Sequence, residues 1–138
     1  MASRRFEDLQ PPARSRAEKF VVLCANENID VLVYCTLRSS AEQNELYTHG
    51  RMKPGPVVTY ARGGFSLHNF GLAFDFVPLI LGKPAWNNEA LYHLCGKIGE
   101  GLGLTWGGSW QGKKKDEPHL QYDGGNTLAE IRSGVVVV

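Results

Sequence analysis

The stretch SLHNFGLAFDF, residues 66–76, holds His68 and Asp75 seven positions apart among small and apolar residues. In a strand, alternate side chains share a face, so Asp75 is expected to lie opposite the neighbouring phenylalanines, on a side that Gly71 and Ala73 leave open. His68, just before this strand, can turn onto the same opening. A buried carboxylate is costly unless a charged or hydrogen-bonding group meets it. The stretch therefore predicts a core strand and, on its open face, a partner for Asp75.

A second polar cluster, DEPHLQY at residues 116–122, supplies candidates for that partner. His119 is expected on the face opposite its apolar neighbours, so that His68, Asp75 and His119 together offer two imidazoles and one carboxylate. Catalytic zinc takes three ligands of these types and keeps a fourth position for water. Asp116, three residues before His119, would then take the proton of that water. Spacing alone leaves open a purely structural role for either histidine.

The remaining pattern consists of short elements separated by Gly- and Pro-rich turns. Mixed helices and strands without a regular βαβ rhythm predict an α+β fold, with a small, mainly antiparallel sheet and three main helices in a single domain over residues 1–138. The first expected helix follows Pro11 and Pro12 and ends near Asn28, the second runs from Ser39 or Ser40 to Gly50, and the third from an Asn87 or Asn88 cap to Leu102. The other expected strands are DVLVYCT (30–36), Leu104–Trp106 and His119–Tyr122, and residues 50–64 are expected to form a surface loop.

Periodicity also predicts which side chains are buried. Alternation along DVLVYCT places Val33 and Cys35 on a common face, and helical spacing turns Leu46 and Leu94 toward the core. The three cysteines form no CxxC pair and lie in apolar patterns, so they are expected to be buried thiols. The C-terminal VVVV is expected to be either an edge strand or a frayed tail.

Charge and hydropathy exclude several classes of partner. With 15 basic and 14 acidic residues the net charge is +1, so no nucleic-acid or lipid partner is indicated. The one basic run, Lys113–Lys115, is short and is interpreted as a solvated loop. No segment has the length of a membrane span, and the charged N-terminus lacks the apolar core of a secretory signal. We therefore expect synthesis in the cytoplasm and no membrane insertion.

The motif SxHxxGxAxD followed by acid-x-x-His resembles the zinc D,D-carboxypeptidase and L,D-endopeptidase family, which cleaves peptidoglycan stem peptides. The longer stretch TLRSSAEQNELYTHGRMKPGPVVTYARGGFSLHNFGLAFDF, together with GLTWGGSW, is similar to its phage and bacterial L-alanyl-D-glutamate endopeptidase branch. The similarity covers roughly residues 5–123. The GKKK segment before Asp116 and Ser109 after WGG depart from the pattern of this branch, in the region of the substrate groove.

The resemblance implies a role for each matching position. His68, Asp75 and His119 would bind Zn²⁺, and Asp116 would be the general base, with Glu117 as a rival that the spacing disfavours. Arg38 would stabilise the developing oxyanion or hold a substrate carboxylate. The positions assigned to substrate binding are Ser66 beside the metal, Gln43 in the segment of Arg38, and Trp106 near the site, although a helix cap explains Gln43 and core packing explains Trp106 equally well.

Together these points predict a zinc-dependent endopeptidase that cleaves the L-Ala–D-Glu bond of the stem peptide, most simply a phage endolysin used in host lysis. We expect a monomer without a separate cell-wall-binding domain, made in the host cytoplasm, released through a separate holin, and acting in the periplasm and cell wall. A D-Ala-D-Ala carboxypeptidase or dipeptidase, which shares the metal motif, is the alternative enzyme. A non-catalytic cell-wall-binding module is the alternative outside the enzyme class.

Overall fold

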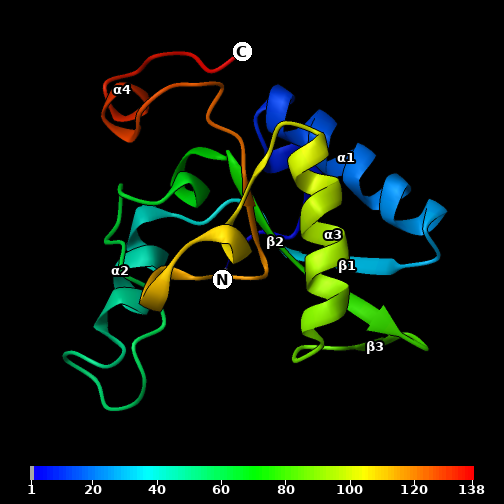
Figure 1. Ribbon diagram of the computed structural model, residues 1–138. Coiled ribbons are helices and arrows are strands. Elements are labelled where there is room, and N and C mark those ends of the chain that lie inside the picture. The colour runs from blue at the N-terminus through cyan, green and yellow to red at the C-terminus, as the bar shows by residue number, and fades with distance from the viewer. Residues whose placement is uncertain (1) are drawn as a thin grey trace.

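The computed structural model describes residues 2–138, which form a five-stranded antiparallel sheet with helices packed against it (Figure 1). The sheet order is β1-β2-β5-β4, and β3 pairs with the far end of β2. This arrangement confirms the predicted α+β fold. The helices are α1 (Pro11–Asn26), α2 (Ser40–Thr48), α3 (Glu89–Gly101) and the short α4 (Leu128–Arg132). The strands are β1 (Asp30–Cys35), β2 (Ala73–Ile80), β3 (Lys83–Pro84), β4 (Thr105–Trp106) and β5 (His119–Gln121).

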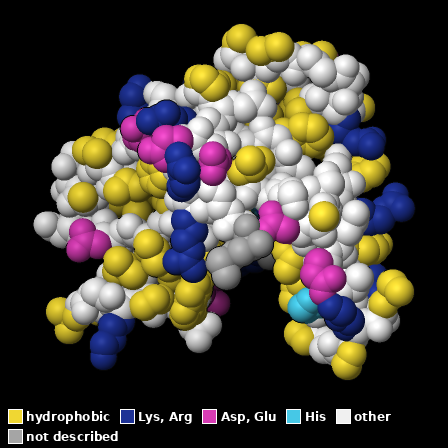
Figure 2. Space-filling view, turned by 180° about the vertical axis from the view of Figure 1, so that it is seen from behind, with side chains coloured by type: hydrophobic (Ala, Val, Ile, Leu, Met, Phe, Trp, Pro, Cys, Tyr) yellow, Lys and Arg dark blue, Asp and Glu magenta, His cyan; other side chains and the backbone are white. Residues whose placement is uncertain are grey.

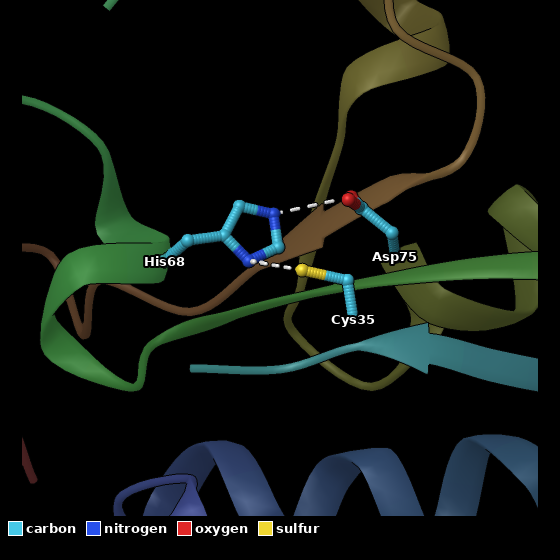
Figure 3. Close-up of side chains that lie close together, drawn as sticks. All are labelled: Cys35, His68 and Asp75. Carbon is cyan, nitrogen blue, oxygen red and sulfur yellow. Dashed lines mark hydrogen bonds and ion pairs between the residues drawn. The ribbon is translucent and has the colours of Figure 1, made fainter. Parts of the chain in front are cut away.

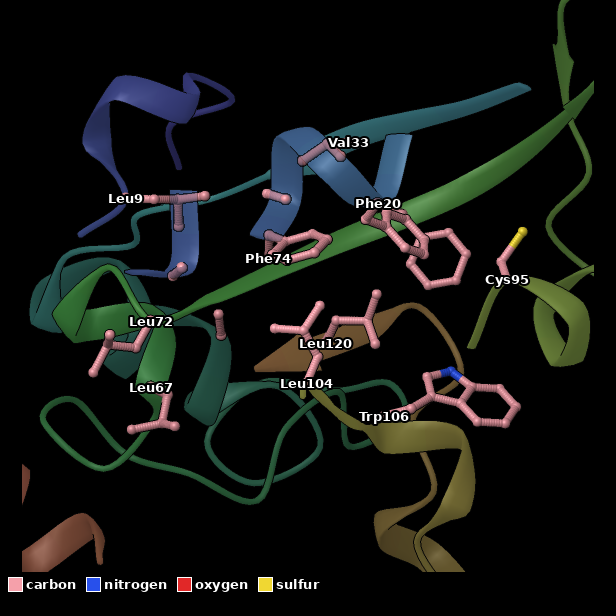
Figure 4. Packing of buried hydrophobic residues seen from close by; sticks show 14 of the residues in the cluster. Leu9, Phe20, Val33, Leu67, Leu72, Phe74, Cys95, Leu104, Trp106 and Leu120 are labelled. Carbon is pink, nitrogen blue, oxygen red and sulfur yellow. The ribbon is translucent and has the colours of Figure 1, made fainter. Parts of the chain in front are cut away.

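Helices α1 and α3 pack together on one face of the sheet and enclose the core (Figures 1 and 4). The Phe20 ring of α1 lies 5.7 Å from the ring of Phe74 and 5.0 Å from that of Phe76. Tyr92 of α3 contacts Phe76 with ring centroids 5.5 Å apart. These aromatic side chains hold the helices on this face, which leaves the opposite face of β2 for Asp75. None of the helices among residues 2–138 is long and apolar enough to cross a membrane.

The helix caps settle the alternatives that the sequence left open. Ser39 caps α2, accepting a hydrogen bond from the Glu42 N–H, and Asn88 caps α3, accepting one from the Leu91 N–H. Two of the predicted buried positions differ in the structure. The buried residue of α2 is Gln43 rather than Leu46, and Leu94 of α3 is 54% exposed. Helix α3 is oriented by its packing against the sheet and α1, whereas α2 turns Gln43 inward to hydrogen-bond Arg38, Thr59 and Ala61.

A β-bulge at Tyr34 changes the faces of β1. Val33 pairs with Phe76, but Cys35 pairs with Asp75, and the register shifts between them. Because Phe76 and Asp75 point to opposite faces of β2, Val33 and Cys35 also lie on opposite faces, which contradicts the simple alternation read from the sequence. An extra residue in one strand reverses the alternation beyond it. The bulge thus turns Cys35 away from the helices and beside Asp75.

The segment before β2 also differs from the expected strand. Residues Leu67–Phe70 form a turn of 3₁₀ helix, and Gly71 ends it in the left-handed region at φ 66°. A Cβ on Gly71 would lie 2.9 Å from the Asp8 carbonyl oxygen. The glycine therefore permits a tight turn and close packing against the N-terminal segment, and it does not open space beside Asp75 as predicted.

The loop and the C-terminal segment complete the outline. Residues 54–66 form no helix or strand, as predicted for a surface loop. The terminal valines form neither an edge strand nor a wholly frayed tail, because Val137 is 3% exposed and belongs to the core. The Tyr122 hydroxyl donates a hydrogen bond to the Val138 carbonyl, which ties this end of the chain to the segment after β5. All three cysteines are buried thiols, as expected.

Candidate active site

The sheet register places three side chains in a row on the face away from α1 and α3. Cys35 of β1 and His119 of β5 both pair with Asp75 of β2, one from each side. Residues directly opposite in neighbouring strands point to the same face and lie within contact distance. His68 reaches the same place from the 3₁₀ turn that precedes β2. Two separate sequence motifs are thereby joined at one carboxylate.

His68 is held in a defined orientation. Its Nδ1 lies 2.8 Å from the Thr36 carbonyl oxygen, to which it donates, and its Nε2 lies 3.1 Å from Asp75 Oδ1. The Cys35 sulfur lies 3.8 Å from Nδ1, while Asp75 faces the other ring nitrogen (Figure 3). A carbonyl acceptor at one ring nitrogen fixes the tautomer and leaves the other nitrogen available as a ligand. Nε2 of His68 is the available atom.

His119 has the complementary arrangement. Its Nδ1 lies 3.4 Å from Asp75 Oδ1, and its Nε2 donates to Gln121 Oε1 at 2.8 Å. Two imidazole nitrogens therefore converge on one carboxylate oxygen, and each ring is oriented by a partner on its far side. This donor set fits zinc, which favours imidazole and carboxylate ligands with such supporting hydrogen bonds. The sequence assigned no role in the site to Thr36 or Gln121, although Gln121 lies two residues from His119 and so is expected on the same strand face.

The electrostatics of the cluster are strongly coupled. Burial favours the neutral form of His68, but the facing carboxylate of Asp75 outweighs burial and raises the pKa of His68 to about 10. Burial likewise favours neutral Asp75, but His68 and the hydrogen bond from His119 hold the pKa of Asp75 below its usual range. Protonated His68 thus neutralises Asp75 in the metal-free protein, and a cation bound at the cluster would take over that role.

Asp116 lies beside the same cluster. One oxygen of its carboxylate is within 4.8 Å of the donor atoms of Asp75 and His119. Asp116 is exposed at the pocket, yet partial burial of its carboxylate raises the pKa of Asp116 despite the opposing effect of His119. Glu117 does not line the pocket, and its carbonyl accepts a hydrogen bond from Trp106 Nε1 at 2.8 Å. The geometry therefore favours Asp116 over Glu117 as the group next to a bound water.

Arg38 approaches the cluster from the other side. Its Nη2 lies 3.6 Å from Asp75 Oδ2 and donates to the Cys35 sulfur at 3.3 Å, while its Nη1 donates to Gln43 Oε1 at 2.8 Å. Gln43 is fully buried and donates in turn to Thr59 Oγ1 and to the Ala61 carbonyl. Gln43 therefore does not line the pocket as a substrate-binding residue. Its hydrogen bonds orient Arg38 and anchor the loop of residues 54–66 at Thr59 and Ala61.

An open pocket of about 1140 Å³ gives access to the cluster. Ser66 lines it, as predicted, and its hydroxyl accepts a hydrogen bond from the His68 N–H. Trp106 does not line it: the side chain is 4% exposed, and Trp106 pairs with Leu120, which faces the helices. Trp110 takes that place, with its ring 5.2 Å from that of His119. The register of β4 against β5 buries Trp106, the predicted residue, and leaves Trp110 at the pocket.

Comparison with known proteins gives sequence and structural matches. A family model described as D-alanyl-D-alanine carboxypeptidase matches residues 59–122. The chain is 42% identical over 123 residues to the peptidoglycan L-alanyl-D-glutamate endopeptidase CwlK of Bacillus subtilis (strain 168), covering 83% of this chain and 73% of CwlK.

Among solved structures, the Serratia marcescens L-Ala D-Glu endopeptidase ChiX matches with a TM-score of 0.59 and 22% identity over 89% of each chain. The LdcB LD-carboxypeptidase matches with a TM-score of 0.63 and 22% identity, over 92% of this chain and 72% of that one. A vancomycin resistance D,D-pentapeptidase, VanY, determined in complex with Zn(II), matches with a TM-score of 0.60 and 13% identity, over 91% of this chain and 78% of VanY. At these identities the structural matches establish the fold.

Proposed function

Because the chain belongs to the zinc D,D-carboxypeptidase and L,D-endopeptidase family, we propose that this metallopeptidase of peptidoglycan cleaves the bond between L-Ala and D-Glu in the stem peptide. The observation that carries the proposal is the convergence of His68 Nε2 and His119 Nδ1 on Asp75 Oδ1, with Asp116 beside them. The 42% identity to an enzyme named for this bond supports the choice of substrate.

His68, Asp75 and His119 are the residues that would hold Zn²⁺. Bound zinc supplies Lewis acidity, which lowers the pKa of a bound water and polarises a carbonyl group. The VanY structure, which contains Zn(II) and shares the fold, supports zinc as the metal. Thr36 and Gln121 keep the two imidazoles oriented.

The protein's own groups then have separate tasks. Asp116 accepts the proton of the attacking water and later delivers it to the amine that leaves. Arg38, held by Gln43 and Cys35, presents a guanidinium toward the centre and stabilises the negative charge that develops on the substrate carbonyl oxygen. Ser66, at the edge of the pocket, positions the peptide.

Digestion of purified sacculi followed by mass spectrometry of the new ends tests the bond. We expect new N-terminal D-Glu, loss of activity with a chelator, and recovery on adding zinc. Release of D-Ala instead would identify the protein as a D-Ala-D-Ala carboxypeptidase. Co-sedimentation with sacculi without any released peptide would identify a cell-wall-binding module.

The biological role that we propose is that of a monomeric, single-domain phage endolysin acting on the wall of its host. It would be made in the host cytoplasm and reach the periplasm and cell wall through a separate holin. Expression in a Gram-negative bacterium tests this role. We expect lysis only when a holin is co-expressed, and lysis without one would show another route to the wall.

A further inference from the structure

The lysine run 113–115 forms part of the wall of the active-site pocket. Gly112–Lys114 form a turn of 3₁₀ helix, and all three lysines line the same pocket as His68, Asp75 and His119. All three lysines are exposed, so their ammonium groups are accessible from solvent. The run is therefore more than a solvated loop remote from the site.

The backbone fixes the position of this run relative to Asp116. The Lys115 N–H donates to the Gly112 carbonyl, which closes the turn, and the Asp116 N–H donates to the Gly107 carbonyl at 2.9 Å. The His119 N–H in turn donates to the Asp116 carbonyl. The lysines consequently precede, without any intervening residue, a segment that is tied to the metal-ligand strand. The three lysines and Asp116 thus follow one another along the same pocket wall.

Their charge is not neutralised within the protein. Across residues 2–138, none of the ion pairs includes Lys113, Lys114 or Lys115. Of the carboxylates that line the pocket, Asp75 and Asp116 belong to the metal cluster, and Asp123 accepts a hydrogen bond from the Gly125 N–H. On the face shown in Figure 2, by contrast, charges of both signs are interspersed. Residues 113–115 are therefore a local cluster of three positive charges within a pocket wall that also carries Arg38 and these three carboxylates.

The proposed substrate carries the complementary charge. A D-Glu residue has two carboxyl groups, and only one of them continues the peptide, so the other is a free carboxylate a few bonds from the scissile amide. We infer that Lys113–Lys115 form a carboxylate-binding subsite that selects stem peptides in which this group is ionised over those in which it is amidated. This inference rests on the proposed function, and it assigns specificity to residues outside the metal cluster. Ammonium groups bind carboxylates through charge-assisted hydrogen bonds, which a neutral amide does not form as strongly.

Two synthetic stem peptides test the inference, identical except that the free carboxyl of D-Glu is an acid in one and a primary amide in the other. We expect the wild-type protein, loaded with zinc, to cleave the acid with a kcat/KM roughly tenfold higher. In the triple variant K113Q/K114Q/K115Q we expect the ratio of acid to amide to fall to about one. The preference should also weaken as salt is raised, because exposed charges are screened.

The matched control is K19Q/K83Q/K97Q, which removes the same charge from lysines that do not line the pocket. We expect it to retain the wild-type ratio, which separates a local subsite from the effect of net charge. Circular dichroism of each variant checks folding, and single lysine variants replace any triple variant that does not fold. Equal cleavage of both peptides by the wild type, or a ratio unchanged in the 113–115 variant, overturns the inference while leaving the proposed function standing. Failure to cleave either peptide at the L-Ala–D-Glu bond overturns both.

Discussion

Cys35 lies directly beside Asp75 in the sheet, with its sulfur 3.3 Å from Arg38 Nη2 and 3.8 Å from His68 Nδ1. The thiol therefore touches a metal-ligand candidate and the proposed oxyanion-stabilising arginine at once. Cys35, His68 and Asp75 also form a group close enough to hold a cation. However, the His68 nitrogen that faces Cys35 donates to Thr36, and the nitrogen that faces Asp75 points away from the sulfur. We therefore propose that Cys35 is a positioning residue and that His68, Asp75 and His119 are the metal ligands.

Cys35→Ala tests that assignment. We expect the variant to keep one zinc per chain, measured by atomic emission, because none of the three proposed ligands changes. We expect kcat to fall about threefold to tenfold, because Arg38 loses one of its hydrogen-bond acceptors and becomes less well oriented. Cys24→Ala, which removes another buried thiol far from the site, should keep full activity. Loss of zinc in Cys35→Ala alone would show that the sulfur is a ligand.

Asp116→Asn tests the general base. We expect kcat to fall by about 10²–10⁴ with zinc content unchanged, because the amide cannot take the proton of the attacking water. Glu117→Gln is the matched control and should remain within a few-fold of the wild type, since Glu117 does not line the pocket. The reverse order of effects would move the base to Glu117, and loss of zinc in Asp116→Asn would make Asp116 a ligand.

The metal-free protein should lose stability as pH rises. His68 has a pKa of about 10 in the folded chain against about 6.5 when unfolded, so its pairing with Asp75 stabilises the fold fully below about pH 6.5. That contribution declines as pH rises and is lost through about pH 10. We expect the Tm of the chelated protein to fall across this window more steeply than that of the zinc-loaded protein, in which the metal takes the place of the proton. His93→Gln, at an exposed histidine, should not alter the difference. If the Tm of the metal-free protein had the same pH dependence as that of the zinc-loaded protein, the result would contradict the pairing of His68 with Asp75.

The sequence predicted the positions of site residues only where a local sequence pattern was enough to determine the local structure. The alternation around Asp75 and around His119 survives in β2 and β5, so the metal-ligand candidates could be placed on one face from the sequence. Cys35 could not, because the bulge at Tyr34 is stabilised by pairing with β2, forty residues away. The lysine run could not either, because its place in the pocket wall depends on the fold around Gly107. The features of the site that the sequence did not predict depend on contacts between segments that are far apart in the chain.

The two tryptophans near the site should have opposite phenotypes. Trp106 is buried, its Nε1 donates to the Glu117 carbonyl, and its ring fills the space that a Cβ on Gly96 would enter, so that such a Cβ would lie 2.2 Å from the ring. We expect Trp106→Ala to lower the free energy of unfolding by about 3–5 kcal/mol in urea denaturation. Trp110 lines the pocket and packs near His119.

Trp110→Ala should change the unfolding free energy by less than about 1 kcal/mol, and we expect it to raise KM because a wall of the peptide groove is lost. Activity must be measured on the fraction that remains folded, so that the instability of Trp106→Ala is not mistaken for a catalytic effect. A large rise in KM for folded Trp106→Ala, with none for Trp110→Ala, would return Trp106 to the substrate groove. The expected outcome would instead establish that the register of β4 against β5 decides which tryptophan meets the substrate.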